Sequence, residues 1–169
     1  MSADEEAAVF RAPMRSRRSD AVEGAAVERA LTHGVCGLGG VRLDPPPATL
    51  ADAVRRISAT GGDRLAARLA RFANAPDGAF VWTIDLDGLL WLGRLHGAWY
   101  YDPRSAAAEV DLIHVRPCRW LAAPVAEHRV PAGVRATFAR GGKNWQRIRS
   151  AAVFDASTRL WEEGSRSEQ

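Results

Sequence analysis

Aromatic and basic residues gather in the same stretch of the chain, and together they could bind nucleic acid. Five of the six tryptophans lie between Trp82 and Trp145, in company with two adjacent tyrosines. Between Arg116 and Arg149 the chain has eight basic residues and one acidic residue. Aromatic rings stack on bases and arginines neutralise phosphates, so the combination is typical of nucleic-acid-binding surfaces. The alternative is that the tryptophans belong to the hydrophobic core.

Other kinds of chemistry find little support in the sequence. The four histidines lack metal-ligand spacing and neither cysteine lies in a CxxC motif, so we expect no metal site and no cofactor. No GxSxG nucleophile motif occurs, and the segment GVCGLGG lacks both the GxGxxG spacing and the lysine of a phosphate-binding loop. Catalysis by a histidine with Asp102 or Asp111 stays open, but no spacing favours it. We therefore expect a protein that is not an enzyme.

The composition indicates one globular domain. The chain has 169 residues, 47% of them hydrophobic and 25% charged, which is enough to form its own core. No apolar run approaches the ~18 residues of a membrane span, and the acidic start MSADEEAAVF is unlike a secretory or transit peptide. We expect a cytoplasmic protein without membrane contact, in which Cys36 and Cys118 are reduced and buried.

Hydrophobic spacing predicts the elements that position these residues. Residues 79–84 and 89–95 alternate like two strands around an Asp-Gly step and predict a hairpin. The glycine-rich residues 35–43 suggest a strand edge or a loop. Helices are expected over residues 20–34, 49–57, 63–72, 131–138 and 150–161, with Asp20 as a cap of the first and Gly34 as its end. Further short strands are expected over residues 97–101, 110–115, 120–122 and 144–148.

The two ends of the chain differ from its middle. Residues 1–19 mix both charges with little apolar content and are predicted to form a flexible N-terminal arm. Residues 20–162 are expected to form a single domain, followed by a polar tail over residues 163–169. Within the domain, alternation assigns Trp91 to the core and leaves Trp82 and Trp99 open.

Several segments, in chain order, resemble a known family. GVCGLGG, AFVW, WLGRLHGAWYYD, HVRPCRWL and NWQRI are similar to the PUA-like superfamily, specifically EVE-type domains and the N-terminal base-reading domains of modification-dependent restriction systems. The resemblance covers about residues 30–148, and its most specific pieces are residues 92–97, 101–102 and 114–121. It implies an α+β fold, in which a small, partly open β-barrel of about five to six strands is flanked by short helices.

The resemblance also implies a function and a site. Such domains flip a modified base of DNA, for instance methylated or hydroxymethylated cytosine or methylated adenine, into an aromatic pocket, as in bacterial defence. A partner nuclease or NTPase would then act as the effector. The implied base-pocket residues are Cys36, Gly37, Leu38, Gly39, Trp82, Trp99, Tyr101 and His114. The implied phosphate-binding residues are Arg94, Arg116, Arg119, Arg140, Lys143 and Arg147.

One departure from the family bears on this pocket. Relatives often carry a tryptophan where this chain has Gly40, so the pocket is reshaped, lined by Trp99 instead, or no longer functional. Three other functions stay open: an RNA-binding PUA-like protein, an ASCH-like enzyme of the same fold, and a protein-interaction domain that acts through its helices. The sequence does not choose between DNA and RNA, because recognition of a 2′-hydroxyl takes only one or two polar groups.

Overall fold

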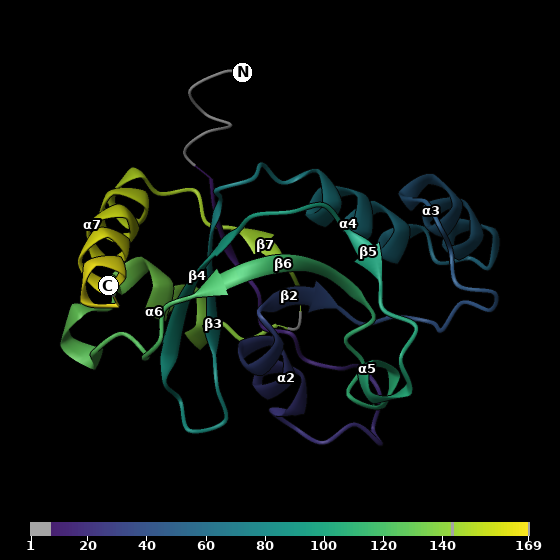
Figure 1. Ribbon diagram of the computed structural model, residues 1–169, viewed down its shortest axis with the longest axis horizontal. Coiled ribbons are helices and arrows are strands. Elements are labelled where there is room, and N and C mark those ends of the chain that lie inside the picture. Colours follow the sequence, from purple (N-terminus) through teal and green to yellow (C-terminus); the bar gives the residue numbers. More distant parts are fainter. Residues whose placement is uncertain (1–7, 143, 169) are drawn as a thin grey trace.

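A curved sheet of seven strands runs through the middle of the computed structural model, which describes residues 8–142 and 144–168 (Figure 1). The strands are β1 (Val9–Arg11), β2 (Val35–Leu38), β3 (Phe80–Ile84), β4 (Leu90–Leu95), β5 (Tyr100–Tyr101), β6 (His114–Trp120) and β7 (Gln146–Arg147). Six of them follow the order β2-β6-β4-β3-β1-β7, and β5 pairs with β6 outside this path. The α+β class and the open, curled sheet confirm the predicted fold, with more strands than the five to six expected.

Helices cover the sheet, and several begin or end where the sequence predicts. They are α2 (Ala25–His33), α3 (Leu50–Ala59), α4 (Asp63–Asn74), α5 (Ser105–Glu109), α6 (Ala132–Ala139) and α7 (Ala151–Ser167), with a 3₁₀ turn at Glu127–Arg129. The hydroxyls of Thr49 and Ser150 accept the capping hydrogen bonds of α3 and α7. Gly34 ends α2 in the left-handed conformation, but the cap at its start is Gly24, so the prediction of Asp20 is wrong. The polar tail predicted from residue 163 instead continues α7 to Ser167.

The predicted hairpin of β3 and β4 is present, closed by Asp85. This carboxylate accepts the backbone N–H groups of Asp87 and Leu89, and Gly88 takes the positive φ of 82° that the turn requires. The Asp85 carboxylate also accepts the indole N–H of Trp91 at 2.9 Å. Trp91 is only half-buried, so its assignment to the core is wrong; the polar end of the ring reaches the turn instead.

The N-terminal segment is part of the sheet rather than an arm. Strand β1 pairs in parallel with β3, with Val9 opposite Phe80, and antiparallel with β7. Val9 is fully buried and Met14 nearly so. The prediction of a flexible arm over residues 1–19 is therefore wrong for residues 8–14, because the apolar partners of this short strand come from distant parts of the chain. Residues 1–7 lie outside the described residues.

Strand β6 joins two strands that the sequence separates. Strand β6 begins at His114, after α5, and continues without a break through Pro117. Pro117 lies in the gap between the strands predicted over residues 110–115 and 120–122. Proline lacks an N–H, and Pro117 lies where the partner along one edge of β6 changes from β5 to β4. Its carbonyl still accepts the backbone N–H of His96, while β2 pairs along the other edge.

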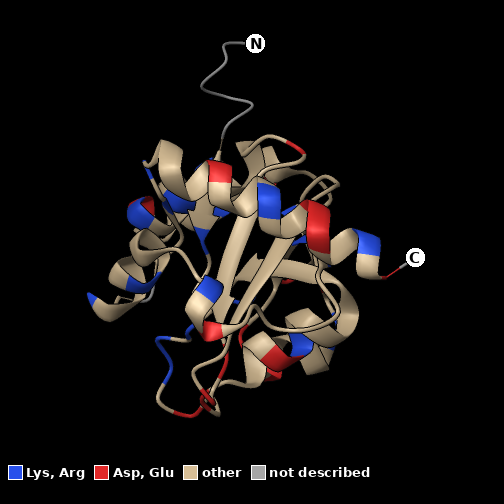
Figure 2. Cartoon of the chain, turned by 90° about the vertical axis from the view of Figure 1, so that its left-hand side faces the viewer, with Lys and Arg blue, Asp and Glu red and all other residues tan. Residues whose placement is uncertain are grey.

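Two hydrophobic cores lie against the sheet. Alternation along β3 sends Val81 into a core with α2, α3 and α4, and sends Phe80 and Trp82 into a second core with α6 and α7. Figure 2 marks both basic and acidic residues along α7, and several of them are exposed, so this helix presents mixed charge to solvent. The two cores anchor β6, whose first residues form the centre of the site described next.

Candidate functional site

His114, the first residue of β6, is the centre of an aromatic cluster. Trp99, just before β5, donates its indole N–H to Nδ1 of His114 across 3.3 Å, and the two rings lie 6.0 Å apart at 22°. Tyr101 pairs with His114 across β5 and β6, and its ring meets the imidazole edge-on at 5.5 Å. The backbone N–H of Leu43 donates to the Tyr101 hydroxyl at 2.8 Å and holds that ring in place. Three predicted base-pocket residues thus come together.

Glycines at the end of β2 bring backbone against this cluster. A Cβ on Gly37 would lie 2.4 Å from the carbonyl oxygen of His114, and one on Gly39 would lie 2.4 Å from the Asp111 carboxylate. A Cβ on Gly40 would lie 3.7 Å from Nε2 of His114. The close approach of the chain at Gly37 and Gly39 therefore leaves no room for a side chain. Leu38 pairs with His114 in the sheet and Gly37 lies against its carbonyl oxygen, whereas Gly39 lies against Asp111.

His114 is held neutral, with one ring nitrogen unused. Its side chain is fully buried, and desolvation lowers its pKa to about 4, although the nearby Asp111 opposes this in part. Because an indole N–H can only donate, Nδ1 accepts from Trp99 and the imidazole proton lies on Nε2. Nε2 has no hydrogen-bond partner among the described residues. A buried donor without an acceptor costs free energy that a bound acceptor would recover.

A cleft of about 1050 Å³ opens beside Gly39 and Gly40. It lies between the loop after β2, helices α4 and α5, and residues 15–20. Its charged lining is Arg15, Arg17, Arg18, Arg42, Arg64 and Arg68, with Asp20, Glu109 and Asp111. Its apolar lining includes Leu38, Val41, Leu65 and Ile113. We call this space the arginine cleft.

Most of the positive charge in the arginine cleft is not neutralised within the chain. Arg18 pairs with Asp20 at 3.0 Å, and the Asp111 carboxylate already accepts hydrogen bonds from the Ser16 hydroxyl and the Gly40 backbone N–H. Burial and the neighbouring guanidinium groups of Arg17 and Arg71 lower the pKa of Arg68. Among the described residues, no hydrogen bond or ion pair involves Arg15, Arg42, Arg64 or Arg68. These side chains are available to an anion.

The sequence analysis missed the arginine cleft as a site. The sequence assigned residues 1–19 to a flexible arm, and the arginines of α4 were left unmentioned. Arg64 and Arg68 are four residues apart and so share a face of the helix. That spacing is the local signal that could have identified them, whereas the position of Arg42 opposite them depends on the tertiary fold.

Two predicted base-pocket residues do not adjoin His114. Trp82 is fully buried in the second core, where its indole N–H donates to the Ser157 hydroxyl at 3.0 Å. Alternation along β3 places it there, so its assignment as a stacking wall is wrong. Cys36 is fully buried in β2 opposite Arg116, and burial raises the pKa of its thiol to about 12. It is a small core residue rather than part of a pocket surface.

Arg116 is structural, which corrects its assignment to phosphate binding. Only 2% of its surface is exposed. Its guanidinium donates to the carbonyl oxygens of Phe72, Ala75 and Gly97 at 2.6–3.0 Å, and it pairs with Asp77 at 2.8 Å. Every part of the guanidinium fork is engaged in holding the end of α4 against the sheet.

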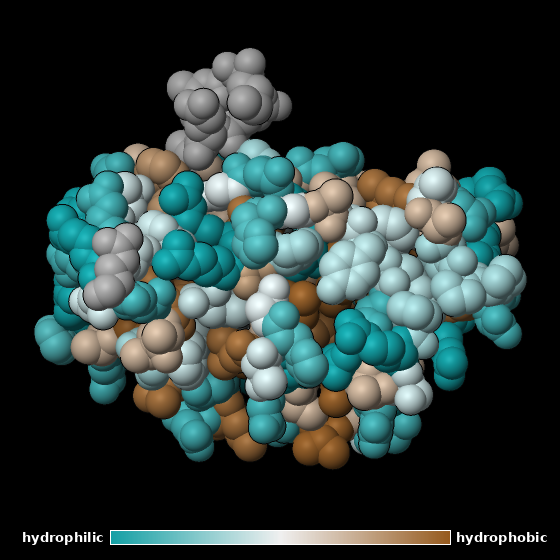
Figure 3. Space-filling model, in the orientation of Figure 1, coloured by the Kyte–Doolittle hydropathy of each residue, from teal (hydrophilic) through white to brown (hydrophobic). Residues whose placement is uncertain are grey.

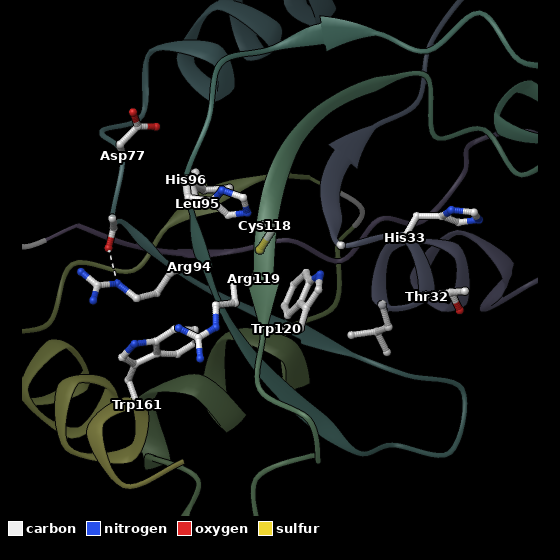
Figure 4. Close-up of a pocket in the computed structure, with 13 residues that line it drawn as sticks. Thr32, His33, Asp77, Arg94, Leu95, His96, Cys118, Arg119, Trp120 and Trp161 are labelled. Carbon is white, nitrogen blue, oxygen red and sulfur yellow. Dashed lines mark hydrogen bonds between the residues drawn. The ribbon is translucent and has the colours of Figure 1, made fainter. Parts of the chain in front are cut away.

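Arg94 and Arg119 line a different cavity, of about 930 Å³, on α2, β4, β6 and α7 (Figure 4). Arg94 donates to the Gly78 carbonyl at 3.0 Å and lies 4.7 Å from the centre of the Phe80 ring. Arg119 pairs with Glu168 at 3.3 Å and approaches the Trp161 ring at 5.4 Å. The structure therefore does not bring these two arginines to the His114 cluster.

The remaining predicted phosphate contacts lie near β7. Arg140 and Arg147 line a third cleft, between α6, β7 and the end of α4. Lys143 lies outside the described residues. The predicted phosphate-binding set is thus divided among three places rather than gathered at one.

Other kinds of site find no support in the described part of the chain. No three or more His, Cys, Asp and Glu side chains there are grouped to hold a metal ion. None of its helices combines the length and apolar character that crossing a membrane requires. Its large exposed hydrophobic residues are Val22, Val41, Leu86, Leu89 and Tyr100, of which Leu86 and Leu89 share the turn between β3 and β4. The face shown in Figure 3 is mostly hydrophilic, with smaller hydrophobic areas in its centre and along its lower edge.

Comparisons with known proteins find a similarity among solved structures. No protein-family model matches it, and neither does any curated protein. Among solved structures it is similar to the YTH domain of a Zygosaccharomyces rouxii protein in complex with N6-methyladenosine RNA, over 93% of this chain and 86% of that chain. The sequence identity is 11% and the TM-score is 0.43. At that TM-score the similarity carries no argument about function, and the PUA/EVE assignment stays a prediction.

Proposed function

We propose that this chain is a non-catalytic nucleic-acid-binding module that holds one nucleotide in the arginine cleft, next to His114. One observation carries the proposal. Arginines that have no partner among the described residues line a cleft beside Gly40, and Gly40 lies next to the unused Nε2–H of His114. A partner protein, a nuclease or an NTPase, would act as the effector, and any cleavage of the bound nucleic acid would come from the nuclease.

The charge of the arginine cleft supports a polyanionic ligand. Arg42, Arg64 and Arg68 come from two segments of the chain and line one space without a hydrogen-bond or ion-pair partner among the described residues. Guanidinium groups match phosphate geometry and bind it in a bidentate manner. Phosphate contacts of this kind give an affinity that falls steeply with salt.

The apolar and polar groups at the bottom of the arginine cleft support recognition of a modified nucleobase. Leu38, Leu65 and Ile113 offer an apolar surface that suits a methyl substituent. The Nε2–H of His114 can donate to a ring nitrogen or carbonyl oxygen of the base once the segment at Gly40 moves by a small amount. We propose that the base is methylated or hydroxymethylated cytosine or methylated adenine in DNA, flipped out of the stack.

RNA is the second candidate ligand, because the same donor would read an unpaired base in RNA. Bases in RNA loops are already unstacked, so no flipping energy is required. The two ligands share one prediction, that affinity depends on the arginines of α4, and differ in which probe binds more tightly.

The experiment is a fluorescence-anisotropy titration at two salt concentrations. The probes are matched DNA duplexes with and without each modified base, the same sequences as single strands, and a stem-loop RNA. The variant is Arg64→Ala with Arg68→Ala, and the control is Arg159→Ala, an exposed arginine on α7 outside the cleft. We expect preference for one modified probe and, in the double variant, a salt slope reduced by about 0.7–0.9 per lost phosphate contact. Equal loss in the control variant, or no binding of any probe, would overturn the proposal.

A further inference from the structure

A second basic cleft lies beside the edge strand of the sheet. It has a volume of about 1060 Å³ and is bounded by α6, β7 and the C-terminal end of α4. Its charged lining is Arg11, Arg71, Arg140, Arg147 and Arg149, and no acidic residue occurs among the described residues that line it. We call this space the β7 cleft.

The positive charges of the β7 cleft act on one another. Burial and the nearby Arg140 lower the pKa of Arg11, whose guanidinium is turned inward to the carbonyl oxygens of Thr137 and Gly141. Arg71 and Arg149 are exposed, and neither makes a hydrogen bond or ion pair with the described residues. The cleft therefore holds two guanidinium groups, those of Arg71 and Arg149, that have no partner among the described residues, which favours an anionic ligand.

The two clefts adjoin each other at Asn144 and Trp145. Asn144 lines the arginine cleft, where its side-chain oxygen accepts a hydrogen bond from Arg17 at 2.7 Å. Trp145 lines the β7 cleft and stacks on Phe10 with ring centres 4.5 Å apart. The indole N–H of Trp145 is buried and has no acceptor among the described residues. Consecutive residues thus face the two spaces.

Helix α4 connects the clefts on its exposed face. Arg64, Arg68 and Arg71 follow the i, i+4, i+7 spacing that puts side chains on one side of a helix. The first two line the arginine cleft and the third lines the β7 cleft. At 1.5 Å per residue, the row is about 10 Å long, which is more than the separation of two consecutive phosphates of one strand.

We propose that the β7 cleft binds the phosphate backbone of nucleotides that flank the one in the arginine cleft, so that a single strand of nucleic acid runs along α4 through both. This inference rests on the proposed function and extends it, since it gives the site a direction and a length. A ligand confined to one nucleotide would contact only the arginine cleft. A longer strand gains the additional contacts with Arg71 and Arg149.

The test compares two lengths of single-stranded DNA. Fluorescein-labelled oligothymidylates of about 4 and about 12 nucleotides, within the range typical of such grooves, are titrated by anisotropy at several salt concentrations. The variant is Arg71→Ala with Arg149→Ala, and Arg159→Ala is the matched control. Both substituted side chains are exposed and make no hydrogen bond or ion pair within residues 8–142 and 144–168, so the fold is expected to be retained, which circular dichroism checks.

We expect the longer probe to bind the unaltered protein at least tenfold more tightly than the short one. In the double variant this gain should shrink several-fold and the salt slope for the long probe should fall by about 1.4, while binding of the short probe is unchanged. Binding of long probes that is the same in the double variant and the control would refute this inference and leave the proposed function standing. Binding of duplexes without binding of single strands would refute it in the same way. Failure of both oligothymidylates while a modified probe still binds would refute this inference alone, and failure of the modified DNA and RNA probes as well would remove the proposed function.

Discussion

The indole N–H of Trp99 points at Nδ1 of His114, 3.3 Å away, and so determines which imidazole nitrogen carries the proton. Burial lowers the pKa of His114 to about 4 and keeps the ring neutral, while Trp99 fixes its tautomer. The two effects together leave a single N–H donor, at Nε2, without a partner among the described residues. Recognition of a base through Nε2 would then depend on Trp99 even without direct contact between Trp99 and the base.

The protonation of His114 predicts a pH dependence of stability. The pKa is about 4 in the folded protein and about 6.5 when unfolded, so between these values the unfolded chain binds a proton that the folded one does not. The contribution of neutral His114 is complete above about pH 6.5 and falls by up to about 1.4 kcal/mol per pH unit as the pH drops toward 4. Urea denaturation of the unaltered protein and of His114→Gln measures it, and we expect a flatter profile for the variant.

Two outcomes would contradict this prediction. One is an identical pH profile for both proteins between pH 4 and pH 6.5. The other is an NMR titration in which the ring signals of His114 shift near their ordinary pH in the folded protein. The NMR measurement uses the unaltered protein, so it is informative even if His114→Gln does not fold.

The contact between Gly39 and Asp111 predicts a specific loss of stability. A Cβ at Gly39 would lie 2.4 Å from the carboxylate, which is itself held by Ser16 and the Gly40 backbone N–H. We expect Gly39→Ala to cost about 1–3 kcal/mol of unfolding free energy, a typical cost of overpacking. Thermal or urea denaturation measures the cost.

A double-mutant cycle tests the cause of that loss. In an Asp111→Ala background the obstacle is absent, so Gly39→Ala should cost clearly less than in the unaltered protein. Equal costs in the two backgrounds would mean that the carboxylate is not what excludes a side chain at residue 39.

Substitution of Arg116 should destabilise the protein far more than substitution of Arg119, although both belong to the basic stretch of the sequence. Arg116 donates to three backbone carbonyl groups and is buried, so Arg116→Ala should cost about 3–5 kcal/mol of stability by leaving those acceptors unpaired. Arg119 is exposed with one surface ion pair, so Arg119→Ala should change stability by less than about 1 kcal/mol. Denaturation of the two variants measures both values, and a reversed order would contradict the structural role of Arg116.

Local signals in the sequence predicted most elements but not the partners of β1. The end of α2 at Gly34, the cap of α3 at Thr49 and the hairpin of β3 and β4 depend on residues close in sequence, and each is present. The segment Val9–Arg11 carries no such signal. Its burial depends on pairing with β3 and β7, which a reading of local composition cannot show.

Contacts between distant segments also limited how much of the candidate site could be predicted from the sequence. Pairing between β2, β5 and β6 brings His114 together with Tyr101 and the end of β2, residues that the resemblance named and that no local pattern joins. The basic stretch between Arg116 and Arg149 was misleading, because folding buries Arg116 and directs Arg119 to α7. The arginines of the arginine cleft instead come from three separate segments, which only the tertiary fold brings together.

Trp82 lies in the core and Trp99 lies in the candidate site, and substitution of each by phenylalanine tests this difference. Trp82→Phe removes the buried hydrogen bond to Ser157 and part of the ring volume, so it should cost about 1–3 kcal/mol of stability and leave nucleic-acid affinity unchanged. Trp99→Phe keeps a half-buried aromatic ring but removes the donor to His114, so stability should fall less and affinity should fall about tenfold, the equivalent of one hydrogen bond of ordinary strength. Denaturation and anisotropy on the same preparations measure both quantities. The two substitutions are chemically identical, so each serves as the control for the other. Weaker binding by Trp82→Phe at unchanged stability would contradict the assignment of Trp82 to the core. Unchanged binding by Trp99→Phe would remove His114 from the site.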